Sequence, residues 1–309
     1  MSSASNIRRK RPPLPAWFKN NLPEAGQGTR TLARTTTTVG GHALHTVCEE
    51  AKCPNISFCW SRGTATFMVA GQSCTRNCRF CSVQHEHQPP PPDENEPGRL
   101  ADAIAQMKLD YAVITVVNRD DLEDGGAAHY RACLDAVQAR IPTIGLELLC
   151  SDLNGNETAL AALLDGAPLK VFAHNIETVE RLTANVRDRK ASFATSIRIL
   201  EKSKELRPDL LTKSSIMVGL GETEEDMHAA MKSLRGAGVE ILTIGQYLAP
   251  TATHYPILAF PNPNQFARWE KAALEMGFLS VASGPFVRSS FRAGDLYRSA
   301  CEKRDLSQK

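Results

Sequence analysis

Residues 64–83 read TATFMVAGQSCTRNCRFCSV and join an apolar, β-branched run to a loop rich in cysteine. The run at 64–70 predicts a buried strand. Cys74, Cys78 and Cys81 follow it with the spacing C-x3-C-x2-C. Zinc sites prefer pairs of cysteines, and ferredoxin runs supply a fourth ligand. Three thiolates on one loop instead indicate a [4Fe-4S] cluster whose fourth iron stays open.

The open iron indicates a small chelating molecule, and S-adenosylmethionine offers an amine and a carboxylate for that position. The alternative is a structural zinc site that borrows a histidine, either His85 or His87. We favour the cluster because the loop follows a strand of a predicted barrel, at the end where barrel enzymes carry their chemistry.

A second group of three cysteines precedes the first, in VCEEAKCPNISFCW. Cys48, Cys53 and Cys59 have the spacing C-x4-C-x5-C and also lack a fourth cysteine. The pattern by itself supports only a metal site, but beside the first triad it indicates a second cluster. The remaining three of the nine cysteines are isolated in sequence, so we interpret them as buried or incidental thiols: Cys133, Cys150 and Cys301.

Composition and charge exclude several classes of function. The chain has 36 basic and 34 acidic residues and a net charge of +2, so it has no field of one sign to hold nucleic acid or an anionic membrane. No apolar run approaches the length of a membrane span, and residues 1–17 lack the apolar stretch of a secretory signal. We therefore expect a cytoplasmic protein whose cysteines are thiols or metal ligands.

Strands and helices alternate along the middle of the chain, which predicts a parallel sheet with helices outside. After 64–70, strands are expected at 111–117, 143–150, 170–176, 215–220 and 241–248. Helices are expected at 98–108, 126–140, 156–165, 192–206 and 223–236, followed by a helix at 263–276 and a short strand at 279–282. Six such units favour a partial (β/α)6 barrel related to the TIM barrel.

This barrel divides the chain into three predicted parts. Residues 1–63 form an N-terminal extension with little periodic structure, residues 64–284 form the barrel, and residues 285–309 form a C-terminal tail. Polar side chains follow several strands, where active sites of barrels lie. Among them, Asn118, Asn175 and Glu177 are candidates for cofactor contact.

The chain closely resembles the lipoyl synthases, a family of radical S-adenosylmethionine enzymes. The resemblance covers most of the chain and rests on these segments in order: VCEEAKCPN with Cys59-Trp60, TATFMVAGQSCTRNCRFCSV, VITVVNRDDLEDGGAAHY, HNIETV, KSSIMVGLGET, GQYLAPT and RSSFRAG. It departs from the family pattern at Phe58, usually glutamate, and at Phe291, usually tyrosine. Neither position is a ligand in the family.

The resemblance implies an activity, its cofactors and its partners. Lipoyl synthases insert two sulfur atoms at C6 and C8 of an octanoyl group that is attached to a lysine of a carrier protein. It implies two [4Fe-4S] clusters and S-adenosylmethionine. The implied partners are octanoylated carriers (E2 subunits of 2-oxoacid dehydrogenases and the H protein of glycine cleavage), an electron donor such as a flavodoxin or ferredoxin, and iron–sulfur assembly or carrier proteins.

The resemblance also implies roles for particular residues. Cys74, Cys78 and Cys81 would hold the cluster that cleaves S-adenosylmethionine, and Phe80 would contact adenine, although an aromatic side chain there could simply pack. The upstream triad, Cys48, Cys53 and Cys59, would hold an auxiliary cluster that donates sulfur. Its fourth ligand would be Ser290, with Ser289 as the alternative. Without the triads, a Ser-Ser pair near the end of a chain indicates only a turn.

Two rival functions follow from the same residues. Another radical sulfur-inserting enzyme, of the biotin synthase or methylthiotransferase type, would share the C-x3-C-x2-C loop but lack the upstream triad and the RSS segment. A noncatalytic iron–sulfur protein would close each cluster with four protein ligands. Binding of S-adenosylmethionine separates the enzymes from the second rival.

Overall fold

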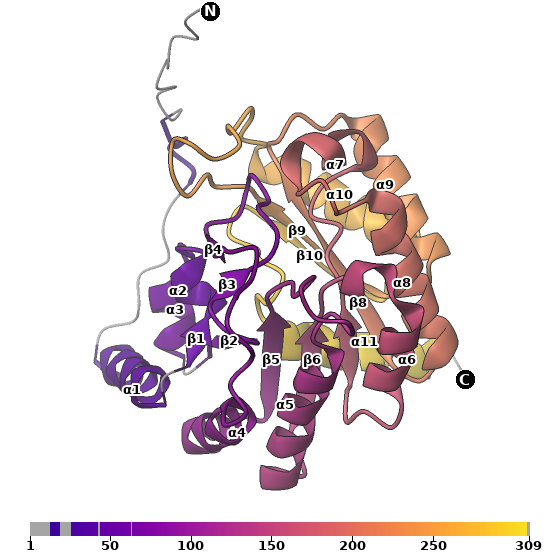
Figure 1. Cartoon of the computed structure of the whole chain (residues 1–309). Coiled ribbons are helices and arrows are strands. Elements are labelled where there is room, and N and C mark those ends of the chain that lie inside the picture. Colours follow the sequence, from indigo (N-terminus) through magenta and orange to yellow (C-terminus); the bar gives the residue numbers. More distant parts are fainter. Residues whose placement is uncertain (1–12, 19–25, 43, 63, 308–309) are drawn as a thin grey trace, which may run out of the picture.

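The computed structural model describes residues 13–18, 26–42, 44–62 and 64–307, and their main feature is one curved sheet (Figure 1). Neighbouring strands are parallel from β2 to β10, and only β1 runs antiparallel, beside β2. The sheet order is β1 (His45–Thr46), β2 (Thr66–Val69), β5 (Tyr111–Val116), β6 (Gly145–Leu149), β7 (Val171–Ala173), β8 (Leu211–Val218), β9 (Ile241–Gln246) and β10 (Ser280–Gly284).

Helices follow the strands and cover the outer face of the sheet (Figure 1). They are α4 (Glu96–Met107), α5 (Ala127–Arg140), α6 (Glu157–Leu164), α7 (Glu180–Val186), α8 (Phe193–Leu206), α9 (Glu224–Gly236) and α10 (Pro263–Glu275), with a short 3-10 turn at Leu153–Gly155. Several begin at a side-chain cap; in α9, Thr223 and Asp226 form a capping box. The predicted partial barrel and its six strand–helix units are confirmed.

The predicted boundaries agree with the structure to within a few residues, and the largest difference is at β8. This strand begins at Leu211 and not at Ser215. Residues 211–214 were not predicted as strand because they include Lys213, and a lysine usually indicates an exposed position. Inside the barrel, however, Lys213 Nζ donates to Glu147 Oε1 at 2.6 Å, and both side chains are about 2% exposed.

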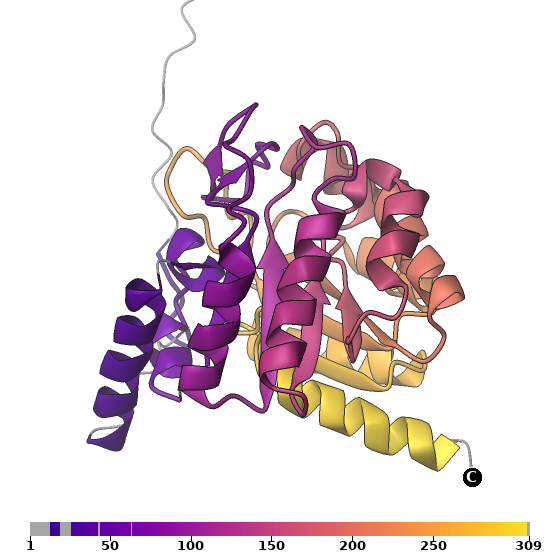
Figure 2. The same ribbon diagram turned by 60° about the horizontal axis from the view of Figure 1, so that its bottom comes forward.

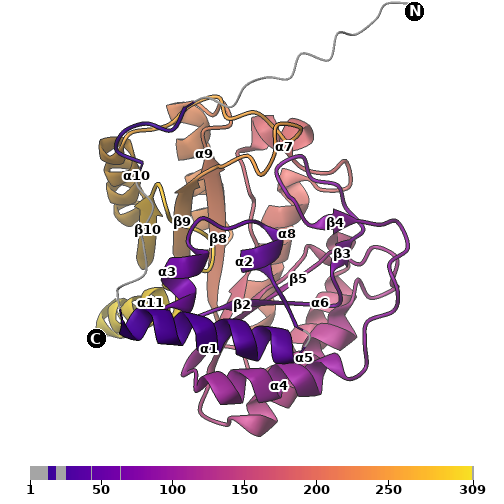
Figure 3. The same ribbon diagram turned by 90° about the vertical axis from the view of Figure 1, so that its left-hand side faces the viewer.

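The prediction of little periodic structure before residue 64 is wrong. The extension contains α1 (Gln27–Gly41), α2 (Val47–Glu50) and α3 (Ile56–Trp60), which lie together on one side of the barrel (Figure 3). Threonine-rich α1 has weak helix formers, but tertiary contacts compensate: Thr35 is buried and its hydroxyl donates to the Trp60 carbonyl at 3.1 Å. Residues 1–12 of the predicted extension lie outside the described residues.

The tail also contains an element that the sequence patterns did not predict, α11 (Ala293–Ser307). Figure 2 shows it crossing the bottom of the barrel. Ala300 is fully buried against the first residues of β7, β8 and β9, with Leu296, Tyr297 and Cys301 packed around it. The helix thus covers the amino ends of the strands and leaves the carboxyl ends open. No helix of the described residues is both long and apolar enough to cross a bilayer.

Candidate active site

A cavity of about 560 Å³ lies at the carboxyl ends of the barrel strands. All six clustered cysteines line it, together with residues from the ends of β5, β6, β7, β8 and β9. The triads come from different segments, one from the loop after β2 and one from α2, α3 and the turn between them. The fold therefore brings both into one space, which the sequence patterns did not establish.

The first cysteine loop is fixed to the barrel through its backbone. A two-stranded ribbon, β3 (Ser73–Cys74) with β4 (Gln84–His85), brings its two ends together. Thr75 donates from both its backbone N–H and its hydroxyl to the carbonyl of Asn118, each at 3.0 Å. The loop is therefore held directly against the segment that follows β5.

Arg76 provides a second anchor that sequence reasoning missed. Its guanidinium forms paired hydrogen bonds with Asp120 at 2.8–3.3 Å and with Asp152 at 2.6–2.7 Å. All three side chains are at most 4% exposed. Burial alone would raise the pKa of Asp152, but the hydrogen bonds from Arg76 hold it below its usual value. Asp120 follows β5 in the quoted RDD run, whereas nothing in the sequence pairs Asp152 with Arg76.

Replacing Arg76 with methionine should lower the free energy of unfolding by about 3–5 kcal/mol, because it leaves buried Asp152 without its cation and leaves Asp120 with only the exposed Lys190. Denaturant unfolding of the apoprotein measures this effect. Arg198→Met is the matched control, since Arg198 pairs with Glu157 where both side chains are exposed, and it should cost less than about 1 kcal/mol. Equal small effects in the two variants would contradict a structural role for the buried pair.

Backbone N–H groups point at two of the loop sulfurs. Arg76 N lies 3.4 Å from Cys74 Sγ, and Asp188 N lies 3.3 Å from Cys78 Sγ. Burial raises the pKa of Cys78 to about 11 and that of Cys81 to about 12. Thiols with such pKa values are neutral near pH 7, and a metal held by them would supply the positive charge that favours thiolates.

Neither triad forms a compact site for a single tetrahedral ion among the described residues. A tetrahedral zinc with Zn–S bonds of about 2.3 Å would hold its sulfurs about 4 Å apart. Among the described residues, neither triad brings its three sulfurs within 4.8 Å of one another. His85 bonds the Cys74 carbonyl through Nδ1 at 3.2 Å, and neither His85 nor His87 lines the cavity. The zinc alternative therefore has no support from geometry.

The second triad faces the C-terminal tail across the cavity. Ser289 and Ser290 both line this cavity, and Ser290 also lines an outer cleft together with Cys59. Asn55 Nδ2 donates to the Phe286 carbonyl at 2.5 Å, so the extension and the tail are in contact. Burial raises the pKa of Cys59 to about 12. Arg288 is half-buried and lines the same cavity.

The two departures from the family pattern are in contact with each other. The rings of Phe58 and Phe291 stack with their centroids 6.3 Å apart, and the guanidinium of Arg62 lies 3.8 Å over the Phe58 ring. Each phenylalanine is next to a residue of the cavity, Cys59 or Ser290. The pair thus joins the extension to the tail by ring packing.

The four candidates for contact with S-adenosylmethionine also line the cavity: Phe80, Asn118, Asn175 and Glu177. Asn175 Nδ2 donates to Glu177 Oε1 at 3.2 Å, while Asn175 Oδ1 is buried and has no partner among the described residues. Glu177 has a φ of 65°, and burial raises the pKa of its carboxyl. Such an unpaired acceptor and a strained backbone are typical of a ligand site.

Comparison with known proteins gives consistent results. Residues 68–234 match the model of the radical SAM superfamily. The chain is 48% identical over 305 residues to "Lipoyl synthase, mitochondrial" of Trypanosoma brucei gambiense, covering 96% of this chain and 74% of that protein. It is 50% identical over 283 residues to "Lipoyl synthase" of an Anaeromyxobacter species, covering 92% and 94%.

Solved structures support the fold alone. The FeFe-hydrogenase maturase HydG from Carboxydothermus hydrogenoformans superposes with a TM-score of 0.56 at 11% identity, covering 88% of this chain and 69% of that one. Methylornithine synthase gives a TM-score of 0.53 at 11% identity, covering 89% and 83%.

Proposed function

Because the chain belongs to the lipoyl synthases, within the radical SAM superfamily, we propose that its two cysteine triads divide one reaction between them. The enzyme inserts two sulfur atoms at C6 and C8 of a protein-bound octanoyl group. In this proposal Cys74, Cys78 and Cys81 serve radical generation, and Cys48, Cys53 and Cys59 serve sulfur donation.

The cofactors are two [4Fe-4S] clusters and S-adenosylmethionine. When bound, they supply a carbon-centred radical that removes hydrogen from an unactivated C–H bond, and the sulfur that replaces it. General acid–base side chains cannot activate such a bond, because it has no acidic proton. The chain's own residues must therefore hold the reactants in position and exclude water.

A single observation carries the proposal: both triads line one cavity. A carbon atom held there can be near the radical source and the sulfur source in turn. Met68, Leu149 and Ile216 also line the cavity and offer an apolar surface for an octanoyl chain. A structural pair of clusters would have no need of a shared space between them.

We assign S-adenosylmethionine to the side of the cavity near β7. The unpaired Oδ1 of Asn175 is a hydrogen-bond acceptor suited to an ammonium or hydroxyl donor, and Glu177 adds a carboxyl group. Asn118 is fixed beside the loop by Thr75, and Phe80 offers a ring that an adenine could stack on. These four roles are proposals.

We assign the fourth auxiliary ligand to Ser290 and not to Ser289. Support comes from the outer cleft, which contains Ser290 and Cys59 but not Ser289, and from the ring contact that holds the next residue, Phe291, against Phe58. A serine oxygen is a harder ligand than a thiolate, so the iron that it holds is easier to release. That property suits a cluster whose sulfur is consumed.

Ser290→Cys should keep the full iron content but lower sulfur insertion about tenfold or more, because the softer ligand holds that iron more firmly. Iron analysis and product mass measure the two effects. Ser289→Cys is the matched control and should behave as wild type. Wild-type turnover by the Ser290 variant, or a cluster spectrum that responds only to Ser289→Ala, would exclude this assignment.

The specific partners of the enzyme and its compartment are also proposals. We propose octanoylated E2 or H-protein domains as substrates, a flavodoxin or ferredoxin as reductant, and an iron–sulfur carrier that rebuilds the auxiliary cluster. We propose the cytoplasm as the compartment, and several relatives are named as mitochondrial. The division into 1–63, 64–284 and 285–309 is likewise proposed.

The direct test of the function is anaerobic reconstitution followed by incubation with S-adenosylmethionine, a reductant and an octanoylated carrier peptide. Peptide mass should show two added sulfur atoms. Cleavage of S-adenosylmethionine with no change in the peptide would favour a different radical enzyme, and failure to bind S-adenosylmethionine would favour a noncatalytic iron–sulfur protein.

A further inference from the structure

The residue immediately after β2 has a backbone conformation that residues with a side chain rarely adopt. Ala70 has a φ of 71°, and Gly71 after it has a φ of 98°. The left-handed region is unfavourable for a residue with a Cβ atom, and such a residue persists there only when its surroundings hold it. These two residues turn the chain from the strand into the cysteine loop, four positions before Cys74.

Two buried charged side chains hold the peptide groups of Ala70. Its N–H donates to Glu96 Oε2 at 2.8 Å, and its carbonyl accepts from Arg119 Nη1 at 3.2 Å. Glu96 is 4% exposed and Arg119 is 1% exposed. Hydrogen bonds to ionised groups are stronger than neutral ones, and these two restrain both sides of the strained residue.

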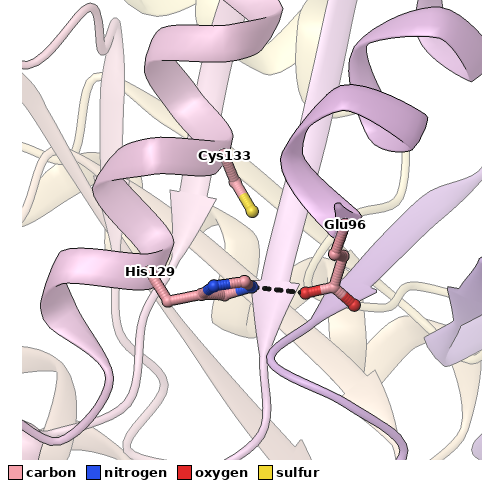
Figure 4. A group of neighbouring side chains, drawn as sticks. All are labelled: Glu96, His129 and Cys133. Carbon is pink, nitrogen blue, oxygen red and sulfur yellow. Dashed lines mark hydrogen bonds and ion pairs between the residues drawn. The ribbon is translucent and has the colours of Figure 1, made fainter. Parts of the chain in front are cut away.

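Glu96 and Arg119 are each held in place by a further side chain. His129 Nε2 lies 2.6 Å from Glu96 Oε2, bringing α5 against the first turn of α4 (Figure 4). Arg119 forms a paired contact with Asp121, at 2.8 and 2.7 Å. The hydrogen bonds therefore connect two helices and the segment after β5 to the two peptide groups that flank the Ala70 Cα atom.

We propose that Glu96 and Arg119 are positioning residues for radical generation, and that His129 orients Glu96. They set the direction in which the chain leaves β2, and so the placement of Cys74. On the other side of Cys74, Thr75 is held by the Asn118 carbonyl and Arg76 by the buried carboxylates described above. This inference rests on the proposed role of Cys74, Cys78 and Cys81.

A metal site is the competing interpretation of the same residues. The ligand atoms of Glu96, His129 and Cys133 all lie within 4.8 Å of one another. However, Glu96 Oε2 already accepts hydrogen bonds from both Ala70 and His129. The hydrogen bonds already made by Glu96 account for this cluster without a metal ion. We therefore favour the positioning role.

The test uses the reconstituted full chain with Glu96→Ala. Cleavage of S-adenosylmethionine per chain should fall about tenfold or more, because small misplacements of reacting groups have large effects on rate. Its apparent Kd for S-adenosylmethionine should rise, and the electron paramagnetic resonance signal of the reduced loop cluster should change. The auxiliary cluster, bound by the same molecule, should keep its iron and its spectrum.

Ala70→Gly provides a rescue that a general loss of stability would not show. Glycine adopts a positive φ without strain, so adding Ala70→Gly to Glu96→Ala should recover cleavage to within about threefold of the wild type. If Glu96→Ala does not fold, Glu96→Gln serves in its place, since it removes the charge and keeps the shape. Absence of rescue in either background would overturn the proposal.

Glu240 offers a matched control at the other end of the barrel. Its Oε2 accepts from the backbone N–H of Thr212 at 3.2 Å and from Lys204 Nζ at 2.8 Å, as Glu96 accepts from Ala70 and His129. Glu240→Ala should leave cleavage within about twofold of the wild type, because Glu240 is remote from the cysteine loop.

The remaining outcomes are distinct. Wild-type cleavage by Glu96→Ala, or equal loss of cleavage in Glu240→Ala, would overturn the positioning role. A zinc ion in the wild type that disappears in Cys133→Ala would show a metal site instead. A wild-type protein that binds both clusters and never cleaves S-adenosylmethionine would refute the proposed function, and it would do so without any variant.

Discussion

Replacing Cys74, Cys78 and Cys81 together with alanine is expected to abolish cleavage of S-adenosylmethionine and to lower the iron content from about eight to about four atoms per chain. The three thiolates are the protein's ligands to one cluster, and without them the cofactor has no iron to chelate. Iron and sulfide analysis, with detection of 5′-deoxyadenosine, measures both effects. We expect no product above the background of the assay.

The matched control removes two cysteines that lie outside the cavity. Cys133 is buried between α4 and α5, and Cys301 packs under the barrel with α11. The double alanine variant should keep about eight irons and near-normal cleavage. Full iron content in the variant that lacks the loop cysteines would refute the prediction of two clusters. One zinc per chain with no sulfide in the wild type would refute it as well.

Replacing Cys48, Cys53 and Cys59 with alanine is expected to separate the two halves of the reaction. The variant should still cleave S-adenosylmethionine, because the loop of the first triad is anchored by Asn118 and the Arg76 pairs, which do not involve α2 or α3. Sulfur insertion should disappear completely. Mass analysis of the octanoylated peptide and detection of 5′-deoxyadenosine report the two halves separately.

Loss of the second cluster should also loosen the extension, since metal binding contributes to the folding of the segment that supplies its ligands. Circular dichroism and proteolysis would detect this change. The test is valid only if the alanine variant of the second triad remains folded. If that variant is folded and retains the first cluster but does not cleave S-adenosylmethionine, the separation of roles is contradicted.

Local sequence patterns were sufficient for the barrel and for the cysteines. Buried strands and amphipathic helices each leave a pattern of apolar residues that is visible in a short stretch of sequence. The six strand–helix units were therefore predicted to within a few residues. C-x3-C-x2-C is likewise a local property, because neighbouring positions on one loop remain close in any fold. The resemblance then extended the prediction to function.

Weakly patterned segments were missed for a definite reason. The helix α1 is rich in threonine and becomes a helix because Thr35 and Val39 are buried against the rest of the protein. The start of β8 was missed because Lys213 is charged, and only its ion pair with Glu147 allows it to be buried inside the barrel. In both cases long-range contacts override the local preference of the chain.

The fold class, the six clustered cysteines and the family could all be predicted from local patterns in the sequence. The shared cavity of the two triads, the pairing of Arg76 with Asp152, and the hydrogen bonds from Glu96 and Arg119 to the backbone of Ala70 became evident from the folded structure. These partners are 26 to 76 residues apart along the chain. Hydrogen bonds and ion pairs act over a few ångströms, so contacts between such distant positions exist only once the barrel has brought its strand ends together.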